Sequence, residues 1–284
     1  MITPILSLGL FVSSLIAGGN PTVTSPCLKI MTFNIRYGTA QDGDNRWAFR
    51  RDVLLGVIRD YSPDVLGLQE ALRFQIDEIL ETFPEYEMLG DGRDDGKTKG
   101  EYSPLLFRRS KLSPDSHSTF WFSDTPDLPG STTWGNSFPR ICTWAVFRVL
   151  TSDRLVAVYN VHLDHESQPS RERSTNLLLH TIKRTGSDFP VVAMGDFNAG
   201  EQNPAVVALK ESLRDSYREL HPKDTVVGTF HAFRGTTTGE KIDHIFVNSG
   251  FDASEASIIR AAENGRYPSD HFPVAATVCF REQP

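Results

Sequence analysis

Residues 191–198 read Val191-Val192-Ala193-Met194-Gly195-Asp196-Phe197-Asn198, an apolar run that stops at an acid and an amide. A short apolar run bounded in this way predicts a buried strand with polar residues at its end. Five further sites have the same form: Asn34 follows residues 28–33, Glu70 follows 65–69, His162 follows 155–161, Asp243 follows Ile242, and Ser269-Asp270-His271 precedes 272–280. Strands that end at one edge of a core would bring these side chains together.

Helical spacing alternates with these strand signals. Leu54, Val57, Ile58 and Tyr61 recur at i, i+3, i+4 and i+7, which is one apolar face of a helix. Similar patterns predict helices over 76–83, over 171–183 and from Pro204, and strands over 104–107, 141–149, 155–162 and 242–247. Hairpins beside helical crossovers indicate mixed sheets. We therefore expect an α/β fold with two sheets in the core and helices outside.

The chain has 284 residues, enough to bury the core of one large domain. Because no linker or repeat interrupts the pattern, we expect a single domain over residues 28–281. Residues 1–19 contain an apolar run followed by small residues, which is typical of a signal peptide, although no Lys or Arg precedes it. We expect residues 20–27 to be a polar lead-in, and the protein to be secreted or periplasmic. No later segment has the apolar length of a membrane helix.

Charge and cysteine content narrow the classes of partner. The net charge is −7, from 29 Lys+Arg and 36 Asp+Glu, which disfavours nucleic acid as a partner. Cys27, Cys142 and Cys279 are too few for a disulfide framework and lack the CxxC spacing of zinc or redox sites. At most one bridge can form, and we expect buried free thiols. A monomer is the default oligomeric state.

The polar residues at the strand ends combine carboxylates, amides and histidines. Singly, each has a simpler explanation: an asparagine after a strand is often a turn or cap residue, and an acid is often a helix cap. Together they form the set that a hard divalent cation and a phosphate ester require. Oxygen ligands favour magnesium or calcium over zinc.

The order of the motifs resembles the endonuclease/exonuclease/phosphatase superfamily, whose members include deoxyribonuclease I and the inositol-polyphosphate 5-phosphatases. The resemblance covers about residues 28–280, and its most specific parts are Gly195-Asp196-Phe197-Asn198 and Ser269-Asp270-His271. The segment 120–145 looks like a largely uncharacterised secreted bacterial and fungal branch. The resemblance implies a four-layer α/β sandwich, with two mixed sheets packed face to face and helices outside, and Mg²⁺-dependent phosphoester hydrolysis, with Mn²⁺ or Ca²⁺ as alternative cations.

The same resemblance implies roles for individual residues. Glu70 looks like the principal metal ligand, with Asn34 and Asp270 completing the metal sphere. His271 looks like the catalytic histidine and Asp243 like the carboxylate that orients it. The remaining catalytic positions are Asp196, which would align or deprotonate water, Asn198, which would hold a phosphate oxygen, and His162, which would donate to the phosphoryl group or leaving oxygen.

Three residues are candidates for a supporting or substrate-binding role. Glu101 resembles the family's second glutamate, which pairs with the histidine at the His162 position. Arg36 follows Asn34 by two residues, and Arg140 precedes a predicted strand, so that either arginine could clamp a phosphate. The aromatic loop 120–140 suits a pocket rim or a satellite hydrophobic cluster equally well.

These observations favour a secreted, metal-dependent hydrolase that cleaves a phosphoester by metal- and histidine-assisted attack of water. The acidic chain favours a small or lipid-linked phosphate ester as the substrate. Two alternatives remain open: a non-specific extracellular nuclease, for which Arg36, Arg46, Arg50, Arg51, Arg171 and Arg173 would have to converge, and a catalytically silent binding module on the same fold.

Overall fold

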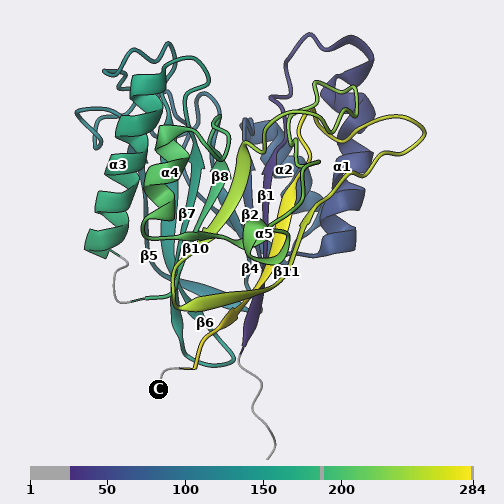
Figure 1. The fold of residues 1–284 in the computed structure, drawn as a ribbon. Helices are drawn as coiled ribbons and strands as arrows, with labels where there is room; N and C mark the ends of the chain where they lie inside the picture. The colour runs from purple at the N-terminus through teal and green to yellow at the C-terminus, as the bar shows by residue number, and fades with distance from the viewer. Residues whose placement is uncertain (1–25, 186–188, 283–284) are drawn as a thin grey trace, which may run out of the picture.

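Two sheets face each other in the computed structural model, which describes residues 26–185 and 189–282 (Figure 1). The strands of the first sheet are β1 (Cys27–Asn34), β2 (Val65–Gln69), β3 (Tyr86–Leu89), β4 (Leu105–Arg108), β11 (Phe251–Ile258) and β12 (Val274–Phe280). Those of the second are β5 (Leu112–Trp121), β6 (Ile141–Val149), β7 (Leu155–His162), β8 (Val191–Asp196), β9 (Arg214–Asp215) and β10 (Asp243–Val247).

Both sheets are mixed, as predicted. The first has the order β11-β12-β1-β2-β4-β3 and the second the order β5-β6-β7-β8-β10-β9. In each sheet one central pair is parallel, β1 with β2 and β7 with β8, and the flanking pairs are antiparallel. A parallel pair needs a crossover, and a helix supplies it in both cases.

Helices cover the outer face of each sheet (Figure 1). The helices α1 (Trp47–Tyr61) and α2 (Arg73–Thr82) pack on the first sheet, and α3 (Gln168–Thr185) and α4 (Pro204–Lys210) pack on the second. A third apolar cluster, which contains Ile30, Val158 and Ile245, fills the space between the sheets. The short helices η1 (Gly43–Asn45) and α5 (Ser216–Leu220) lie in connections. The four-layer α/β sandwich is confirmed.

Alternation along the central strands decides which residues enter the space between the sheets. In β1, Leu28 and Ile30 belong to the inter-sheet cluster, whereas Met31 and Phe33 contact the helices. Side chains two residues apart share a face, so Asn34 lies on the inter-sheet face at the end of β1. The same alternation applies to β8, where Val192 and Met194 belong to the inter-sheet cluster, so Asp196 also faces the first sheet.

Gly195 lets β8 lie close to β7. Its φ is +146°, and a Cβ at this position would lie 2.0 Å from the Val161 carbonyl oxygen. Any side chain would therefore push the two strands apart. Because Asp196 comes next and pairs with His162 in the parallel register, the glycine helps to set these two residues side by side.

The predicted strands over 65–69, 141–149 and 155–162 agree with the structure at both ends, and the predicted helices lie within α1 to α4 or one residue beyond. The strands β3, β5, β9 and β11 were not predicted. Exposed residues in β5 and β11 interrupt the apolar pattern, because these strands lie at sheet edges. The predicted signal peptide and residues 20–25 of the lead-in lie outside the described residues, and β1 begins at Cys27, the last lead-in residue. Within the described ranges, no helix is long and apolar enough to cross a membrane.

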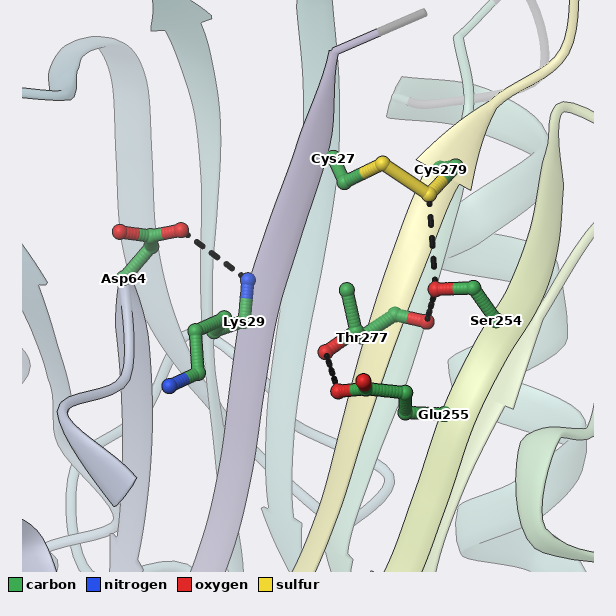
Figure 2. The surroundings of a disulfide bond; sticks show 7 residues. All are labelled: Cys27, Lys29, Asp64, Ser254, Glu255, Thr277 and Cys279. Carbon is green, nitrogen blue, oxygen red and sulfur yellow. Dashed lines mark hydrogen bonds between the residues drawn. A yellow bond between two sulfur atoms is a disulfide. The ribbon is translucent and has the colours of Figure 1, made fainter. Parts of the chain in front are cut away.

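The expectation of free thiols is wrong for two of the three cysteines. Cys27 and Cys279 form a disulfide bond that joins β1 to β12 (Figure 2). These residues are partners in the antiparallel register of β1 and β12, so the fold brings them together although 252 positions separate them. Cys142 is a buried free thiol, as expected. The bond lies at the start of β1, at the opposite end of the strand from Asn34.

His231 is buried although its side chain is polar. It is 2% exposed, its ring stacks on Phe272 with 3.9 Å between centroids, and its Nδ1 accepts a hydrogen bond from the Gly235 N–H at 3.2 Å. Its Nε2 has no hydrogen-bond partner among the described residues. Because burial disfavours the imidazolium form, the pKa of His231 is lowered to about 4.

We expect reduction of the disulfide to destabilise the protein by about 2–4 kcal/mol, because the bond restricts the unfolded chain over a long loop. Urea unfolding with and without dithiothreitol measures the change. The double variant Cys27→Ser, Cys279→Ser should be as unstable as the reduced protein and insensitive to dithiothreitol. Equal midpoints for oxidised and reduced wild-type protein would contradict this.

We expect His231→Gln to make the protein less sensitive to acid. The folded-state pKa of His231 lies below the usual value of 6.5, so the unfolded chain binds more protons between pH 6.5 and 4. This histidine therefore lowers the free energy of unfolding as pH falls through that range. Between pH 7 and 4.5, the free energy of unfolding of wild type should fall by about 2 kcal/mol more than that of His231→Gln, as measured by urea unfolding. The exposed His117, changed to Gln, is the control, and a constant difference for His231→Gln would refute the expectation.

Candidate active site

Polar ends of strands from both sheets meet at one edge of the inter-sheet space. Asp196 at the end of β8 lies between His162 of β7 and Asp243 of β10 in the strand register. Asn34 of β1 faces them from the first sheet, and its amide Nδ2 donates to Asp196 Oδ2 at 2.9 Å. The predicted convergence of these residues therefore occurs.

Asn34 links the two sheets at this edge. Besides the bond to Asp196, its Nδ2 donates to Glu70 Oε1 at 3.0 Å, and its Oδ1 accepts from the Arg36 N–H at 3.0 Å. Asn34 is fully buried, and its bond to Asp196 is buried on both sides, whereas its bonds to Glu70 and Arg36 are partly buried. One amide thereby holds a carboxylate of each sheet, Glu70 from the first and Asp196 from the second.

His271 lies between two buried carboxylates. Its Nδ1 is 2.9 Å from Asp243 Oδ2, and its Nε2 is 3.8 Å from Asp196 Oδ2. Burial alone would lower the pKa of His271, but the charges of Asp243 and Asp196 outweigh it and raise that pKa well above its usual value. The imidazole is therefore a cation at neutral pH.

Asp196 has an unusual protonation equilibrium. Its burial and the neighbouring Asp243 raise its pKa to about 7, against the opposing effects of His271 and of the hydrogen bond from Asn34. Its other oxygen, Oδ1, accepts from the Asn198 N–H at 2.9 Å. A carboxylate held in this way can take up or release a proton near neutral pH.

His162 is held by Arg140. The Arg140 guanidinium lies 3.1 Å from His162 Nε2, and it also contacts Asp164 and His165, at 3.2 and 2.7 Å. A guanidinium has no lone pair, so His162 Nε2 accepts the bond and the ring proton lies on Nδ1. Burial and the Arg140 charge lower the pKa of His162 well below its usual value, so this imidazole is neutral.

Glu70 and Asp270 lie on either side of the Arg36 guanidinium. Arg36 Nη1 is 3.8 Å from Glu70 Oε2, and its Nε is 3.8 Å from Asp270 Oδ2. The closer bonds of Arg36, at 3.1 and 3.0 Å, go to Asp42. Glu70 and Arg36 both have left-handed backbones, with φ of +57° and +55°, which is uncommon outside glycine and typical of functional sites.

Two sets of donors at this edge are candidates for a cation. Asp196, Asp243 and His271 offer ligand atoms that lie within 4.8 Å of one another. His271 Nδ1 is already hydrogen-bonded to Asp243, so that nitrogen is engaged within the protein. Asp243 Oδ1, a buried acceptor with no hydrogen-bond partner among the described residues, belongs to this first set. Asn34, Glu70 and Asp270 form the second set and offer carboxylate and amide oxygen atoms, the chemistry that Mg²⁺, Mn²⁺ and Ca²⁺ prefer. By donor type, the all-oxygen set of Asn34, Glu70 and Asp270 is compatible with a hard cation.

Two predicted residues have partners other than those expected. Glu101 pairs with Arg93, whose Nη1 lies 2.6 Å from Glu101 Oε2, instead of with His162. Asn198, with a left-handed φ of +47°, donates from Nδ2 to the Leu163 carbonyl oxygen at 3.0 Å, so one amide hydrogen is left for another acceptor. Arg140 is 4% exposed, and each of its three nitrogens has a protein partner.

A polar layer beneath the site was not predicted. Gln69 Nε2 donates to Asn160 Oδ1 at 2.6 Å and to Thr32 Oγ1 at 3.0 Å, so these three buried side chains join the sheets below Asn34 and His162. Strand alternation could have predicted the positions of two of these residues, because Thr32 and Asn160 lie two residues before Asn34 and His162 on the same strand faces. Arg50, a buried arginine of α1 beside the site, was considered only as a surface cation.

Comparisons with known proteins agree with this arrangement. The model of the Endonuclease/Exonuclease/phosphatase family matches residues 31–271. Uncharacterized protein L388 of Acanthamoeba polyphaga mimivirus is 31% identical over 268 residues, covering 87% of this chain and 98% of that protein.

Two solved bacterial structures resemble the whole described fold. An endonuclease/exonuclease/phosphatase from Bacteroides vulgatus has a TM-score of 0.84 and 34% identity, over 90% of this chain and 100% of that one. A mannosyl-6-phosphatase from Bacteroides thetaiotaomicron has a TM-score of 0.81 and 32% identity, over 89% of this chain and 100% of that one. The motif order, the fold and these similarities agree, and the chain belongs to the endonuclease/exonuclease/phosphatase family of phosphoester hydrolases.

Proposed function

We propose that the protein is a metal-dependent phosphatase that hydrolyses a small phosphate monoester. The observation that carries the proposal is the joint occurrence of an oxygen-donor group, Asn34, Glu70 and Asp270, and a protonated histidine held between two carboxylates. The first group suits a hard cation, and the second offers positive charge and a proton acceptor to the same phosphate.

A divalent cation, Mg²⁺ by donor type, would be held by Glu70 with Asn34 and Asp270. When bound, it would offset the negative charge of the phosphate and polarise a phosphoryl oxygen. Glu70 comes directly after β2 and Asp270 comes shortly before β12, so backbone hydrogen-bonding in the first sheet supports both ligands.

Asp196 would orient and deprotonate the attacking water. A pKa of about 7 makes this carboxylate a matched proton acceptor at neutral pH, and the Asn198 N–H and the Asn34 amide fix its two oxygens. Protonated His271, oriented by Asp243, would stabilise the charge that develops on the phosphoryl oxygens. Neutral His162, whose Nε2 lies 3.7 Å from Asp196 Oδ2, would line the phosphate site, and the free amide hydrogen of Asn198 would bind a phosphate oxygen.

Features at the rim support a small leaving group. Phe230 is 47% exposed although its ring lies 5.1 Å from the ring of His271, and Phe138 is 49% exposed with its ring 5.4 Å from the Arg93 guanidinium. Exposed aromatic rings beside polar groups suit the faces of sugars and other small cyclic compounds. The similarity to a mannosyl-6-phosphatase supports a sugar phosphate in particular.

The disulfide bond supports export from the cytoplasm. Disulfides persist in secreted and periplasmic proteins and are rare where thiols are kept reduced. Together with the apolar run of the first nineteen residues, Cys27–Cys279 is consistent with a secreted or periplasmic enzyme.

A nuclease is the less favoured function, because two of the arginines it would need are engaged within the protein. Arg50 is fully buried, and Arg36 forms its closest bonds with Asp42. With a net charge of −7, the chain offers little general attraction to a polyanion.

The experiment measures phosphate release from sugar 6-phosphates and, by chromatography of the cleavage products, hydrolysis of a bis-ester, sphingomyelin and duplex DNA, with Mg²⁺ or with EDTA and over a range of NaCl. We expect the highest kcat/KM on a monoester, loss of activity in EDTA and shallow salt dependence. A nuclease would show a log–log slope of about −0.9 per phosphate contacted on duplex DNA. Efficient, steeply salt-dependent DNA cleavage would reject the proposed substrate class, and no turnover of any ester would favour a silent binding module.

Variants in the same assay test the assigned residues. Glu70→Gln keeps the side-chain shape but removes a charged metal ligand. His271→Ala removes the positively charged imidazole. Each variant should therefore lower kcat by about 10²–10⁴-fold. His180→Ala, at an exposed position of α3, should retain wild-type turnover. Equal losses at His180 and His271 would contradict the assignment.

A further inference from the structure

Arg50 carries a guanidinium in the interior whose partners are all backbone carbonyls. The residue is 0% exposed. Its Nη1 donates to the Ile35 oxygen at 2.7 Å and to the Pro268 oxygen at 2.9 Å. Its Nη2 donates to the Arg36 oxygen and its Nε to the Asn45 oxygen, both at 2.9 Å. One side chain of α1 thus joins three separate segments.

The carbonyls that Arg50 binds belong to the segments that carry the proposed metal ligands. Ile35 and Arg36 directly follow Asn34, and Pro268 lies two residues before Asp270. A second bond joins the same segments, from Ser269 Oγ to the Asn34 carbonyl oxygen at 2.7 Å. Two hydrogen-bonded links, of which the guanidinium is the larger, thus join the segments of Asn34 and Asp270 beyond the end of the β1–β12 pairing, beside the ion pair of Arg36 with Asp270.

Burying this charge is unfavourable in itself. Burial lowers the pKa of Arg50 to about 10, although the charges of Asp270, Asp42 and Glu70 oppose the shift. The guanidinium therefore stays positive at neutral pH. The rings of Trp47 and Phe233, 5.2 and 5.7 Å away, add cation–π attraction. An apolar residue would fill the same space without the desolvation penalty, so packing alone does not explain an arginine here.

We propose that Arg50 is a positioning residue for the divalent cation, which fixes the spacing between Asn34 and Asp270 by binding the backbone beside each of them. The inference rests on the proposed assignment of Asn34, Glu70 and Asp270 as ligands. Arg50 touches neither cation nor substrate and acts through the carbonyls of Ile35, Arg36 and Pro268. Lysine cannot replace it, because its donors radiate from one nitrogen and cannot reach carbonyls arranged around a planar fork.

Mn²⁺ affinity tests the inference without using activity. Free Mn²⁺ is measured by electron paramagnetic resonance during titration of wild type, Arg50→Lys and Arg51→Lys, and the metal-free melting temperature of each is recorded. Arg51 is the matched control, because it is the next residue of α1 but its side chain is 42% exposed and pairs with the carboxylates of Asp52 and Glu78 instead of with backbone carbonyls. We expect Arg50→Lys to weaken Mn²⁺ binding by about 10–100-fold, the usual effect of losing a group that orients ligands, and Arg51→Lys to bind within about twofold of wild type.

A rescue experiment separates positioning from general stability. In Arg50→Ala, millimolar guanidinium should restore much of the lost Mn²⁺ affinity, whereas ammonium should not. Wild-type Mn²⁺ affinity in Arg50→Lys would overturn the inference. Unfolding of both Arg50→Lys and Arg50→Ala in the absence of metal would also overturn it, because Arg50 would then stabilise the fold as a whole. Glu70→Gln distinguishes a failure of the ligand assignment from a failure of the role of Arg50. If both Glu70→Gln and Arg50→Lys keep full Mn²⁺ affinity, the proposed ligand set is wrong. If Glu70→Gln loses affinity and Arg50→Lys does not, only the role of Arg50 is wrong.

Discussion

A cationic imidazole between two buried carboxylates is the interaction on which the rest of the site depends. Asp196 and Asp243 are neighbours in the register of β8 and β10, and two such carboxylates out of water repel each other. His271, from the segment before β12, lies 2.9 Å from one and 3.8 Å from the other, so the first sheet supplies the charge that the second sheet lacks. The same contact holds the sheets together at the edge where Asn34 also joins them.

The positions of the strand-end residues could be predicted because alternation and strand ends are local properties of the sequence. Asn34, His162 and Asp196 end their apolar runs and Asp243 begins one, and alternation places all four side chains on the strand face toward the space between the sheets. The central strands β2, β6 and β7 were predicted well for the same reason. Edge strands such as β5 and β11 were not, because pairing with a neighbour and not burial keeps them extended.

Long-range partners could not be predicted, since they depend on which segments the fold brings together. Cys27 and Cys279 are bonded because β1 and β12 pair in one register, which no spacing in the sequence reveals. Glu101 has Arg93 as its partner, and Arg50 binds carbonyls, which all residues have. Alternation does place Asn160 between the sheets, but its bond to Gln69 depends on how the sheets face each other.

We propose a division of labour in which Asn34, Glu70 and Asp270 hold the cation, and Asp243, His271 and Asp196 handle protons and charge. Anomalous scattering from a crystal soaked in Mn²⁺ tests this most directly, because it locates the ion without reference to activity. We expect one strong anomalous peak with oxygen atoms of Glu70 and Asp270 in its coordination sphere, and an intact hydrogen bond between His271 and Asp243. A peak coordinated by His271 together with Asp196 and Asp243 would contradict this division of labour.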